Sequence, residues 1–362
     1  MTTINIENVK GLIKDKSFDE IKVIMENCNV KVRECKTDEL KNLYLLISEN
    51  TQDPTPLQIE CNGLIIEKET NKIVCMCQNQ MINLDSDFIS FEPKNVKYEY
   101  CEDGTIIRYF NYNNNWYTAT TKCIDARKSY WSSEKTFNDM FFDIVGDNTY
   151  DFSKDKTYIF ILKHTENRIV VKHNENELVF VMSINNMTQE ENEMDNSHFK
   201  HPIKLLIEQN KSLNDFYNSK QRGIIVKIYN EKKYWELYKY DFKEYTEKKN
   251  IRGNIPLIRM RYLELLNDPN LPLLEKYYSE NVLLFTMIKH CLNNLYKQVH
   301  QLYINSHVKH QITITNDNPL FQTLKQLHGF YKKTGNIITL DQVKDKINSL
   351  DPNIIKKLLK WV

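Results

Sequence analysis

The stretch CEDGTIIRYFNYNNNWYTATTK, from Cys101 to Lys122, carries the strongest local signal in the chain. Apolar and polar residues alternate on both sides of its asparagine-rich centre, which is typical of two half-buried strands joined by a turn. Asp103 and Gly104 come directly before the first strand, and these residue types suit a tight turn. The stretch therefore predicts an antiparallel β-hairpin that the chain enters through a sharp turn.

Similar alternating runs continue on both sides of this hairpin. They are LQIECNGLIIEKETNKIVCMC from Leu57, KTYIFILKHTENRIVVKHNENELVFVMSIN from Lys156 and GIIVKIYNEKKYWELYKY from Gly223. Runs of this length, separated by short polar turns, indicate antiparallel strands in hairpins. We expect one sheet-rich domain over residues 51–255, interrupted by a helix from about Pro202 to Tyr217.

The two ends of the chain have a helical pattern instead. Residues 1–50 place apolar residues three and four apart, with Thr37 as an expected N-cap, and residues 256–362 repeat this spacing. The predicted fold class is therefore α+β, with an N-terminal helical segment (1–50), a sheet-rich domain (51–255) and a helical C-terminal domain (256–362). The apolar stripe at the end of the chain could pack internally or dock a protein partner.

Composition limits the classes of function. The 362 residues include 41% hydrophobic and 27% charged residues, which excludes extended disorder. The 49 Lys and Arg against 48 Asp and Glu give no polycationic field over the whole chain, so any charged binding surface must be local. No apolar run approaches 18 residues, and we expect no membrane partner. Eight scattered cysteines without a CxxC pair predict reduced thiols in the cytoplasm and no metal site.

Common catalytic motifs are missing from the sequence. It contains no GxGxxG, GxxxxGK[ST], GxSxG or HExxH pattern. His307 and His310 form one i, i+3 pair without the carboxylate of a zinc protease, so a structural role is favoured for both.

Five segments, in one order, resemble the RNA ligase branch of the covalent nucleotidyltransferases, found in phages and large DNA viruses. The segments are CNGLIIEKETNKIVCMCQNQMIN, the hairpin stretch from Cys101, TYIFILKHTENRIVV, QRGIIVKI, and YWELYKYDFKEY followed by IRGN. The resemblance covers roughly 200 residues. It implies an antiparallel-sheet nucleotidyltransferase core, of the ATP-grasp-like RNA ligase kind, and a C-terminal domain that positions RNA.

The resemblance also implies which residues should do chemistry, and several are replaced. The family's nucleophilic lysine, which attacks the α-phosphate of ATP, aligns with Cys101, and its two metal-directed carboxylates align with Ile161 and Arg222. Of the last motif's paired lysines at most one remains. In one register Glu236 and Tyr238 replace both lysines, and in the other Lys239 remains while Asp241 replaces its partner. The selective loss of catalytic charges indicates a pseudoenzyme with no expected cofactor and no catalytic residues.

Positions that specify the fold persist around this degenerate pocket. We expect the pocket to be formed by Cys101, Asp103, Gly104, Ile161, Arg222, Gly223 and Lys239. If the resemblance holds, these side chains should converge on one cleft. Arg222 would then either offer its guanidinium to a phosphate, with Lys239 and Arg108 nearby, or pair with an internal acid such as Glu102 or Asp103.

Three functions stay open at this point. The first is an inactive scaffold that binds single-stranded RNA or a protein. The second is a diverged ATP- and Mg²⁺-dependent RNA ligase that seals 5′-phosphate and 3′-hydroxyl ends and recruits Lys97 or Lys94 as nucleophile. The third is a structural or assembly protein of a large DNA virus. Under each, the AT-rich coding bias and the resemblance favour a viral protein in the cytoplasm of an infected cell.

Candidate RNA contacts come from basic and aromatic residues that lie close together in the sequence. They are Lys122, Arg127, Lys128, Tyr234, Trp235, Lys239 and Arg252. Lysines follow phosphates and aromatic faces stack on bases, and the helix start after Lys135 could add backbone N–H groups. The alternative is that the aromatic residues at every second position simply face a core, and that the basic residues form an ordinary solvated surface.

Overall fold

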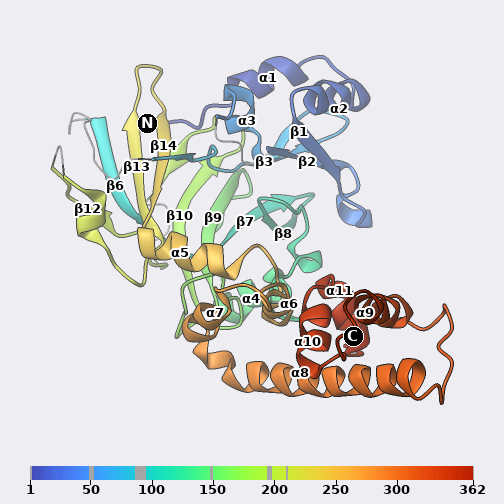
Figure 1. Ribbon diagram of the computed structural model, residues 1–362. Helices are drawn as coiled ribbons and strands as arrows, with labels where there is room; N and C mark the ends of the chain where they lie inside the picture. The colour runs from blue at the N-terminus through green and yellow to red at the C-terminus, as the bar shows by residue number, and fades with distance from the viewer. Residues whose placement is uncertain are drawn as a thin grey trace. The chain divides into compact units, whose positions relative to one another are not determined.

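The structure is a computed structural model that describes residues 2–48, 53–85, 95–146, 150–193, 198–208 and 211–361. The chain divides into two compact units, residues 1–247 and 248–362, each drawn in Figure 1. Three sheets lie in the first unit. The described part of the second unit is helical from Ile258 onward. The predicted α+β class, with antiparallel sheets and C-terminal helices, is confirmed.

The first unit opens with two helices and a four-stranded antiparallel sheet. Its elements are α1 (Glu7–Ile13), α2 (Phe18–Asn27), β1 (Val30–Glu34), the 3₁₀ turn η1 (Asp38–Leu40), β2 (Leu43–Ser48), α3 (Pro56–Glu60), β3 (Asn62–Glu67) and β4 (Ile73–Cys75). The strands are ordered β1-β2-β3-β4. β2, which lies within residues 1–50, pairs with β3 in the same sheet.

The helical prediction for the second half of that segment is wrong. All six residues of β2 are buried, and an unbroken apolar run of this length fits a buried strand as well as a helix. Thr37, expected as an N-cap, makes no capping hydrogen bond.

The second sheet contains the predicted hairpin. Its elements are β7 (Thr105–Tyr112), β8 (Asn115–Thr120), β9 (Lys156–Lys163), β10 (Glu177–Asn185) and β11 (Glu191–Asn192), in the order β11-β10-β9-β7-β8. Asn113 and Asn114 form the two-residue turn with φ of 50° and 63°, the left-handed conformation that asparagine tolerates in such hairpins. Helix α4 (Phe137–Val145) packs Met140 and Phe141 against Phe160 and Phe180 of this sheet.

The third sheet joins strands from distant parts of the sequence. Its elements are β5 (Ile82–Asn83), β6 (Val96–Cys101), β12 (Lys204–Leu205), β13 (Gly223–Tyr229) and β14 (Trp235–Asp241), in the order β12-β6-β13-β14-β5. Only the β14–β5 pair is parallel among the described strands. The helix predicted from Pro202 to Tyr217 is wrong, since the structure has β12 and the 3₁₀ turn η4 (Leu213–Phe216) there.

The second unit is built from helices around one apolar core. Its elements are α6 (Ile258–Glu264), α7 (Leu271–Tyr277), α8 (Val282–Tyr303), the π-helical turn η6 (Ile304–Val308), α9 (Phe321–Thr334), α10 (Leu340–Asn348) and α11 (Pro352–Leu358), preceded by α5 (Lys243–Arg252). The predicted Thr339 cap is confirmed as part of a capping box with Gln342. Within the described residues, no helix has both the length and the apolar character that crossing a bilayer requires.

Close backbone packing at Gly223 gives a test of the third sheet. A Cβ atom at this position would lie 1.9 Å from the carbonyl oxygen of Tyr240. We expect Gly223→Ala to lower the free energy of unfolding by about 3 kcal/mol, because the strands must separate to admit the methyl group. Urea unfolding followed by tryptophan fluorescence measures this loss.

The matched control is Gly11→Ala in α1, where a Cβ would meet no atom within 4 Å. This change should be neutral or should stabilise the protein by about 0.5–1 kcal/mol, because alanine loses less backbone entropy than glycine in a helix. Equal unfolding midpoints for the two variants would contradict the strand packing described here.

Candidate functional site

The turn between β6 and β7 organises the candidate site. Asp103 is 2% exposed and its carboxylate is fully used. Oδ2 accepts hydrogen bonds from the backbone N–H groups of Val170 (3.0 Å) and Val171 (2.7 Å), and Oδ1 accepts one from the Tyr245 hydroxyl (2.7 Å). Three bonds to one buried carboxylate satisfy it without a metal ion. Asp103 therefore ties three segments together.

Gly104 brings the second sheet against this turn. A Cβ at Gly104 would lie 2.6 Å from Cγ2 of Ile161 and 2.6 Å from the carbonyl oxygen of Leu162. Ile161 also packs with the apolar cluster between the first two sheets. The structure thus places Ile161 beside the turn, as an apolar packing residue.

Cys101 ends β6 with a buried thiol. It is 6% exposed and lies opposite Gly223 in the β6–β13 pairing. Burial raises the pKa of this thiol to about 11, although the neighbouring Arg222 acts in the opposite direction. A thiol with this pKa is protonated at neutral pH and is a poor nucleophile.

Arg222 forms a bidentate ion pair with Asp241. Its Nε atom donates to Oδ1 at 2.7 Å and its Nη2 atom donates to Oδ2 at 3.0 Å. The guanidinium also lies 5.3 Å from the centre of the Tyr245 ring. Two parallel charge-assisted hydrogen bonds of this kind fix the guanidinium to the carboxylate.

This pairing corrects part of the expectation for Arg222. The internal acid is Asp241, not Glu102 or Asp103, because Glu102 accepts hydrogen bonds from Lys163 (3.1 Å) and Gln221 (3.0 Å). Arg108 does not join Arg222 either. Its guanidinium is fully buried and donates to the backbone carbonyls of Gly63 and Thr120.

The face of the third sheet that holds Cys101 is strongly polar. Side chains two residues apart share a face of a strand. Across the three strands, Gly223 of β13 pairs with both Cys101 and Asp241. Ile225 of β13 pairs with both Glu99 and Lys239. Lys97, one of the alternative nucleophiles, lies farther along this face with its ammonium 4.5 Å from the centre of the Trp235 ring. Lys94 lies outside the described residues. Cys101 and Lys239 therefore lie on one face of this sheet, and Arg222 directly precedes Gly223, the β13 residue that pairs with Cys101.

A buried ion cluster occupies the next row of the same face. Lys227 is 2% exposed, and its ammonium lies 2.9 Å from Glu99 and 2.8 Å from Glu193. Burial alone would lower the pKa of Lys227, but the two carboxylates raise it. Lys227 lowers the pKa of Glu193 to about 2 despite burial, whereas burial raises the pKa of Glu99.

This ion cluster borders only a very small space between the second and third sheets. Lys227 and Leu237 of one sheet and Met182 of the other line a cavity of about 10 Å³. That volume holds about one water molecule and no nucleotide.

The predicted RNA contacts separate into paired and exposed groups. Arg127 is held by Asp125 (2.8 Å) and Glu39 (3.1 Å). Arg252 is buried and donates to the backbone carbonyls of Ile255 and Pro256. Lys122 and Lys128 are exposed.

The aromatic stretch from Tyr234 is mostly a packed strand. Tyr238 and Tyr240 belong to the apolar cluster on the other face of the third sheet. Trp235 packs against Tyr229, with ring centres 5.0 Å apart. Tyr234 is half-buried. The reading in which alternate aromatic residues face a core fits this strand better than a row of base-stacking platforms.

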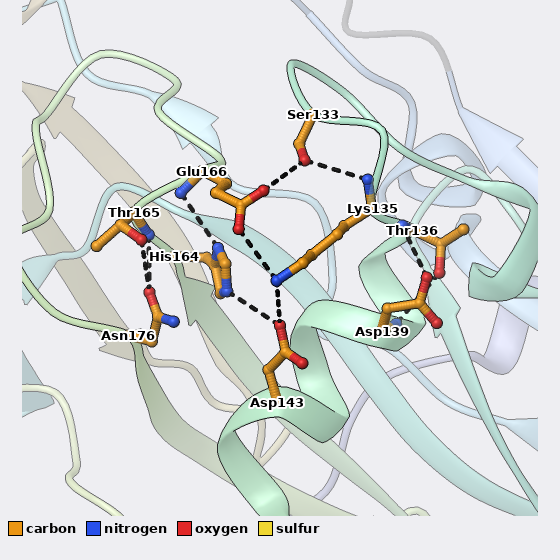
Figure 2. Close-up of polar contacts among 9 residues, drawn as sticks. All are labelled: Ser133, Lys135, Thr136, Asp139, Asp143, His164, Thr165, Glu166 and Asn176. Carbon is orange, nitrogen blue, oxygen red and sulfur yellow. Dashed lines mark hydrogen bonds and ion pairs between the residues drawn. The ribbon is translucent and has the colours of Figure 1, made fainter. Parts of the chain in front are cut away.

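The helix start after Lys135 is acidic rather than anion-binding. Figure 2 shows the Lys135 ammonium between Asp143 (2.9 Å) and Glu166 (3.0 Å). Thr136 and Asp139 form the capping box of α4 and satisfy its first N–H groups. Lys135 and this helix terminus are therefore already neutralised.

His164 is buried at the edge of the same cluster. It is 1% exposed, its Nδ1 atom accepts the backbone N–H of Glu166 at 3.2 Å, and its Nε2 atom lies 3.6 Å from Asp143 (Figure 2). Burial lowers the pKa of this imidazole below its ordinary value of 6.5.

Sequence reasoning missed two features of this region. The Lys227 cluster was not predicted, although a lysine inside the apolar run GIIVKIY signals a buried ion pair. Arg33 and Lys36, which lie in one groove with Lys122 and Lys128, carried no local signal at all.

Comparisons with known proteins give one curated relative and several distant structures. The relative is the "Immediate-early protein ICP-46 homolog" of Invertebrate iridescent virus 6, 26% identical over 405 residues and covering 95% of this chain and 87% of the viral protein. No protein-family model matches the chain.

The similar solved structures include two ATP-dependent ligases. A putative ATP-dependent DNA ligase from Aquifex aeolicus has a TM-score of 0.40 and 13% identity, over 88% of this chain and 81% of the ligase. An archaeal ATP-dependent RNA ligase has a TM-score of 0.42 and 8% identity, over 76% of this chain and 74% of the ligase.

The contribution of the Arg222–Asp241 ion pair to stability can be tested by reversing its two charges. Arg222→Glu and Asp241→Lys should each lower the free energy of unfolding by roughly 3 kcal/mol, because each leaves like charges in contact in a mostly buried site. The double variant should recover at least half of the combined loss, since it restores the attraction with opposite polarity. Urea unfolding of all four proteins completes the cycle. Additive losses in the double variant would show that the pair does not couple.

The buried histidine predicts a pH dependence of stability. The folded pKa of His164 lies below that of an unfolded histidine, so the unfolded chain binds the proton first and stability falls as pH drops below about 6.5. His164→Asn cannot titrate in this range, and its side-chain oxygen can still accept the Glu166 N–H. Urea unfolding at pH 7, 6 and 5 should show a shallower decline for the variant than for wild type. Equal slopes would contradict the assignment of His164 as buried and neutral.

Proposed function

We propose that this protein is a catalytically inactive RNA-ligase-like protein that binds single-stranded RNA. The observation that carries the proposal is the Arg222–Asp241 pair beside the buried Cys101 thiol. Together these residues occupy the positions where the resemblance implies a nucleophile, a carboxylate and a lysine. They form a stable structural contact in place of reactive groups.

Adenylate formation needs a nucleophile that attacks the α-phosphate of ATP and displaces pyrophosphate. Cys101 is mostly in the thiol form at neutral pH because its pKa is about 11. Lys97, the described alternative, packs its ammonium over Trp235. Neither group is suited to the attack.

Magnesium recruitment needs carboxylates with unused oxygen atoms. Each of the following acids near Cys101 has an internal partner, although Oε1 of Glu99 is buried and accepts no hydrogen bond. Asp103 accepts three hydrogen bonds, Asp241 pairs with Arg222, Glu102 pairs with Lys163, and Glu99 and Glu193 pair with Lys227. A metal ion bound by two or more of these acids would have to compete with such contacts, which supports an inactive site.

The viral relative supports the biological setting. A protein of Invertebrate iridescent virus 6, named as an immediate-early protein homolog, matches almost the whole chain. We infer that this chain is also a viral protein, and that it acts in the cytoplasm of an infected cell without ATP or Mg²⁺.

The absence of catalysis is tested with α-labelled ATP and Mg²⁺, followed by a denaturing gel. We expect no label on the wild-type chain under conditions where an active ATP-dependent RNA ligase is labelled. Cys101→Ser is the matched variant. Label that appears on wild type and disappears from Cys101→Ser would overturn the proposal, because it would show an adenylate on the thiol.

RNA binding is tested with a fluorescent single-stranded 12-mer and fluorescence anisotropy. Affinity should not change when EDTA is added, and it should fall as salt rises, because phosphate contacts release counterions. Loss of binding in EDTA would contradict a metal-independent role. No binding at low salt would favour the alternative of a structural or assembly protein.

A further inference from the structure

A groove on the first unit combines a basic rim with an apolar floor. It lies between residues 33–38, at the end of β1, and residues 122–128, in the segment after β8 that includes the 3₁₀ turn η3 (Ala126–Lys128). Its volume is about 560 Å³, within the range of about 300–1,000 Å³ of small-molecule sites. It is separate from Cys101 and Arg222, which are not among its lining residues.

Contacts between the two walls hold the groove open in a defined shape. Arg33 donates from Nη1 to the carbonyl oxygen of Lys122 at 2.9 Å. Thr37 donates from its hydroxyl to Asp125 at 3.1 Å. A ligand would therefore lose little free energy in ordering the site.

The rim is more basic than its composition suggests, because its acids are neutralised by cations other than its lysines. Glu34 pairs with Lys68 (2.7 Å) and Lys22 (3.4 Å), and Asp125 pairs with Arg127. Asp38, the third acid of the lining, is exposed and lies 3.9 Å from Lys41. By contrast, the ammonium groups of Lys36, Lys122 and Lys128 are exposed. No hydrogen bond or ion pair in the described part of the chain engages these three ammonium groups.

The floor of the groove is apolar. Leu45 and Ile124 are buried, and Cys35 and Cys123 beside them are half-buried free thiols. An apolar floor below a row of cations suits a ligand with an uncharged body and phosphate groups, which describes a nucleotide or a strand of nucleotides.

We propose that this groove binds the phosphodiester backbone of single-stranded RNA through Lys36, Lys122 and Lys128, with Leu45, Ile124 and the two thiols beneath the strand. The inference rests on the proposed RNA binding and assigns it to one surface. It places the contact on the groove and not on the pocket around Cys101.

The experiment measures binding of a fluorescent single-stranded 12-mer to the full chain and to two double variants. Lys122→Glu with Lys128→Glu reverses two rim charges. Lys14→Glu with Lys232→Glu makes the same change in net charge at exposed lysines outside the groove. We expect the groove variant to lose at least tenfold in affinity at low salt and to show a smaller salt slope, by about 0.7 per lost contact. The control variant should stay within about twofold of wild type.

A second measurement locates the strand without any substitution. Bound RNA should slow alkylation of Cys35 and Cys123 by a maleimide, measured by mass spectrometry of peptides. Cys28 and Cys291, which are also half-buried, lie outside the groove lining and should react at unchanged rates.

The outcomes separate this inference from the proposed function. RNA binding that is insensitive to the groove variant, or equally weakened by the control variant, overturns the groove and leaves RNA binding intact. Unprotected Cys35 and Cys123 in the RNA complex overturn it as well. If wild type binds no RNA, both proposals fail. If ATP alone binds in the groove and the 12-mer does not, the ligand is a free nucleotide and the assignment to an RNA strand is wrong.

Discussion

The Asp103 carboxylate is the constraint on which the arrangement of the first unit depends. Through three hydrogen bonds it holds the β6–β7 turn, the segment at Val170 and Val171, and Tyr245 of α5. The ring of Tyr245 lies against the guanidinium of Arg222, and this guanidinium forms an ion pair with Asp241 at the end of β14. One buried acid thus fixes the ends of β6, β13 and β14 relative to one another. A buried carboxylate with unsatisfied oxygens would be costly, so these segments are strongly coupled.

Much of the fold could be predicted because its signals are local. The Asn113–Asn114 turn and the alternation on either side of it define the β7–β8 hairpin, and the Thr339 capping box defines the start of α10. The helix predicted at β2 is wrong because an unbroken apolar run has no period that distinguishes a strand from a helix. The helix predicted from Pro202 to Tyr217 is wrong for a related reason. Short strands and 3₁₀ turns depend on residues distant in the sequence, and the local sequence does not indicate those residues.

The candidate site was less predictable than the fold, because its contacts depend on strand register. Arg222 could be recognised as an unusual charge, but its partner follows from the alignment of Gly223 with Asp241 across β13 and β14. The expected acids, Glu102 and Asp103, belong to the turn after β6, and the register of β13 and β14 instead brings Asp241 to Arg222. The groove is even harder to predict from the sequence. Arg33 and Lys122 are 89 residues apart, and only the placement of β1 beside the end of β8 brings their charges together.

The distribution of paired and unpaired charge decides where a polyanion can bind. Three cations near Cys101 are paired with carboxylates inside the protein. Arg222 pairs with Asp241, Lys163 with Glu102, and Lys227 with two glutamates. A phosphate that entered this region would have to displace a carboxylate, and breaking such a buried pair costs about 3–5 kcal/mol. At the groove, Lys36, Lys122 and Lys128 can meet a phosphate without breaking an internal contact, and only solvent and counterions leave. The interior cations are therefore already paired with carboxylates, whereas the proposed strand would meet exposed cations at the groove.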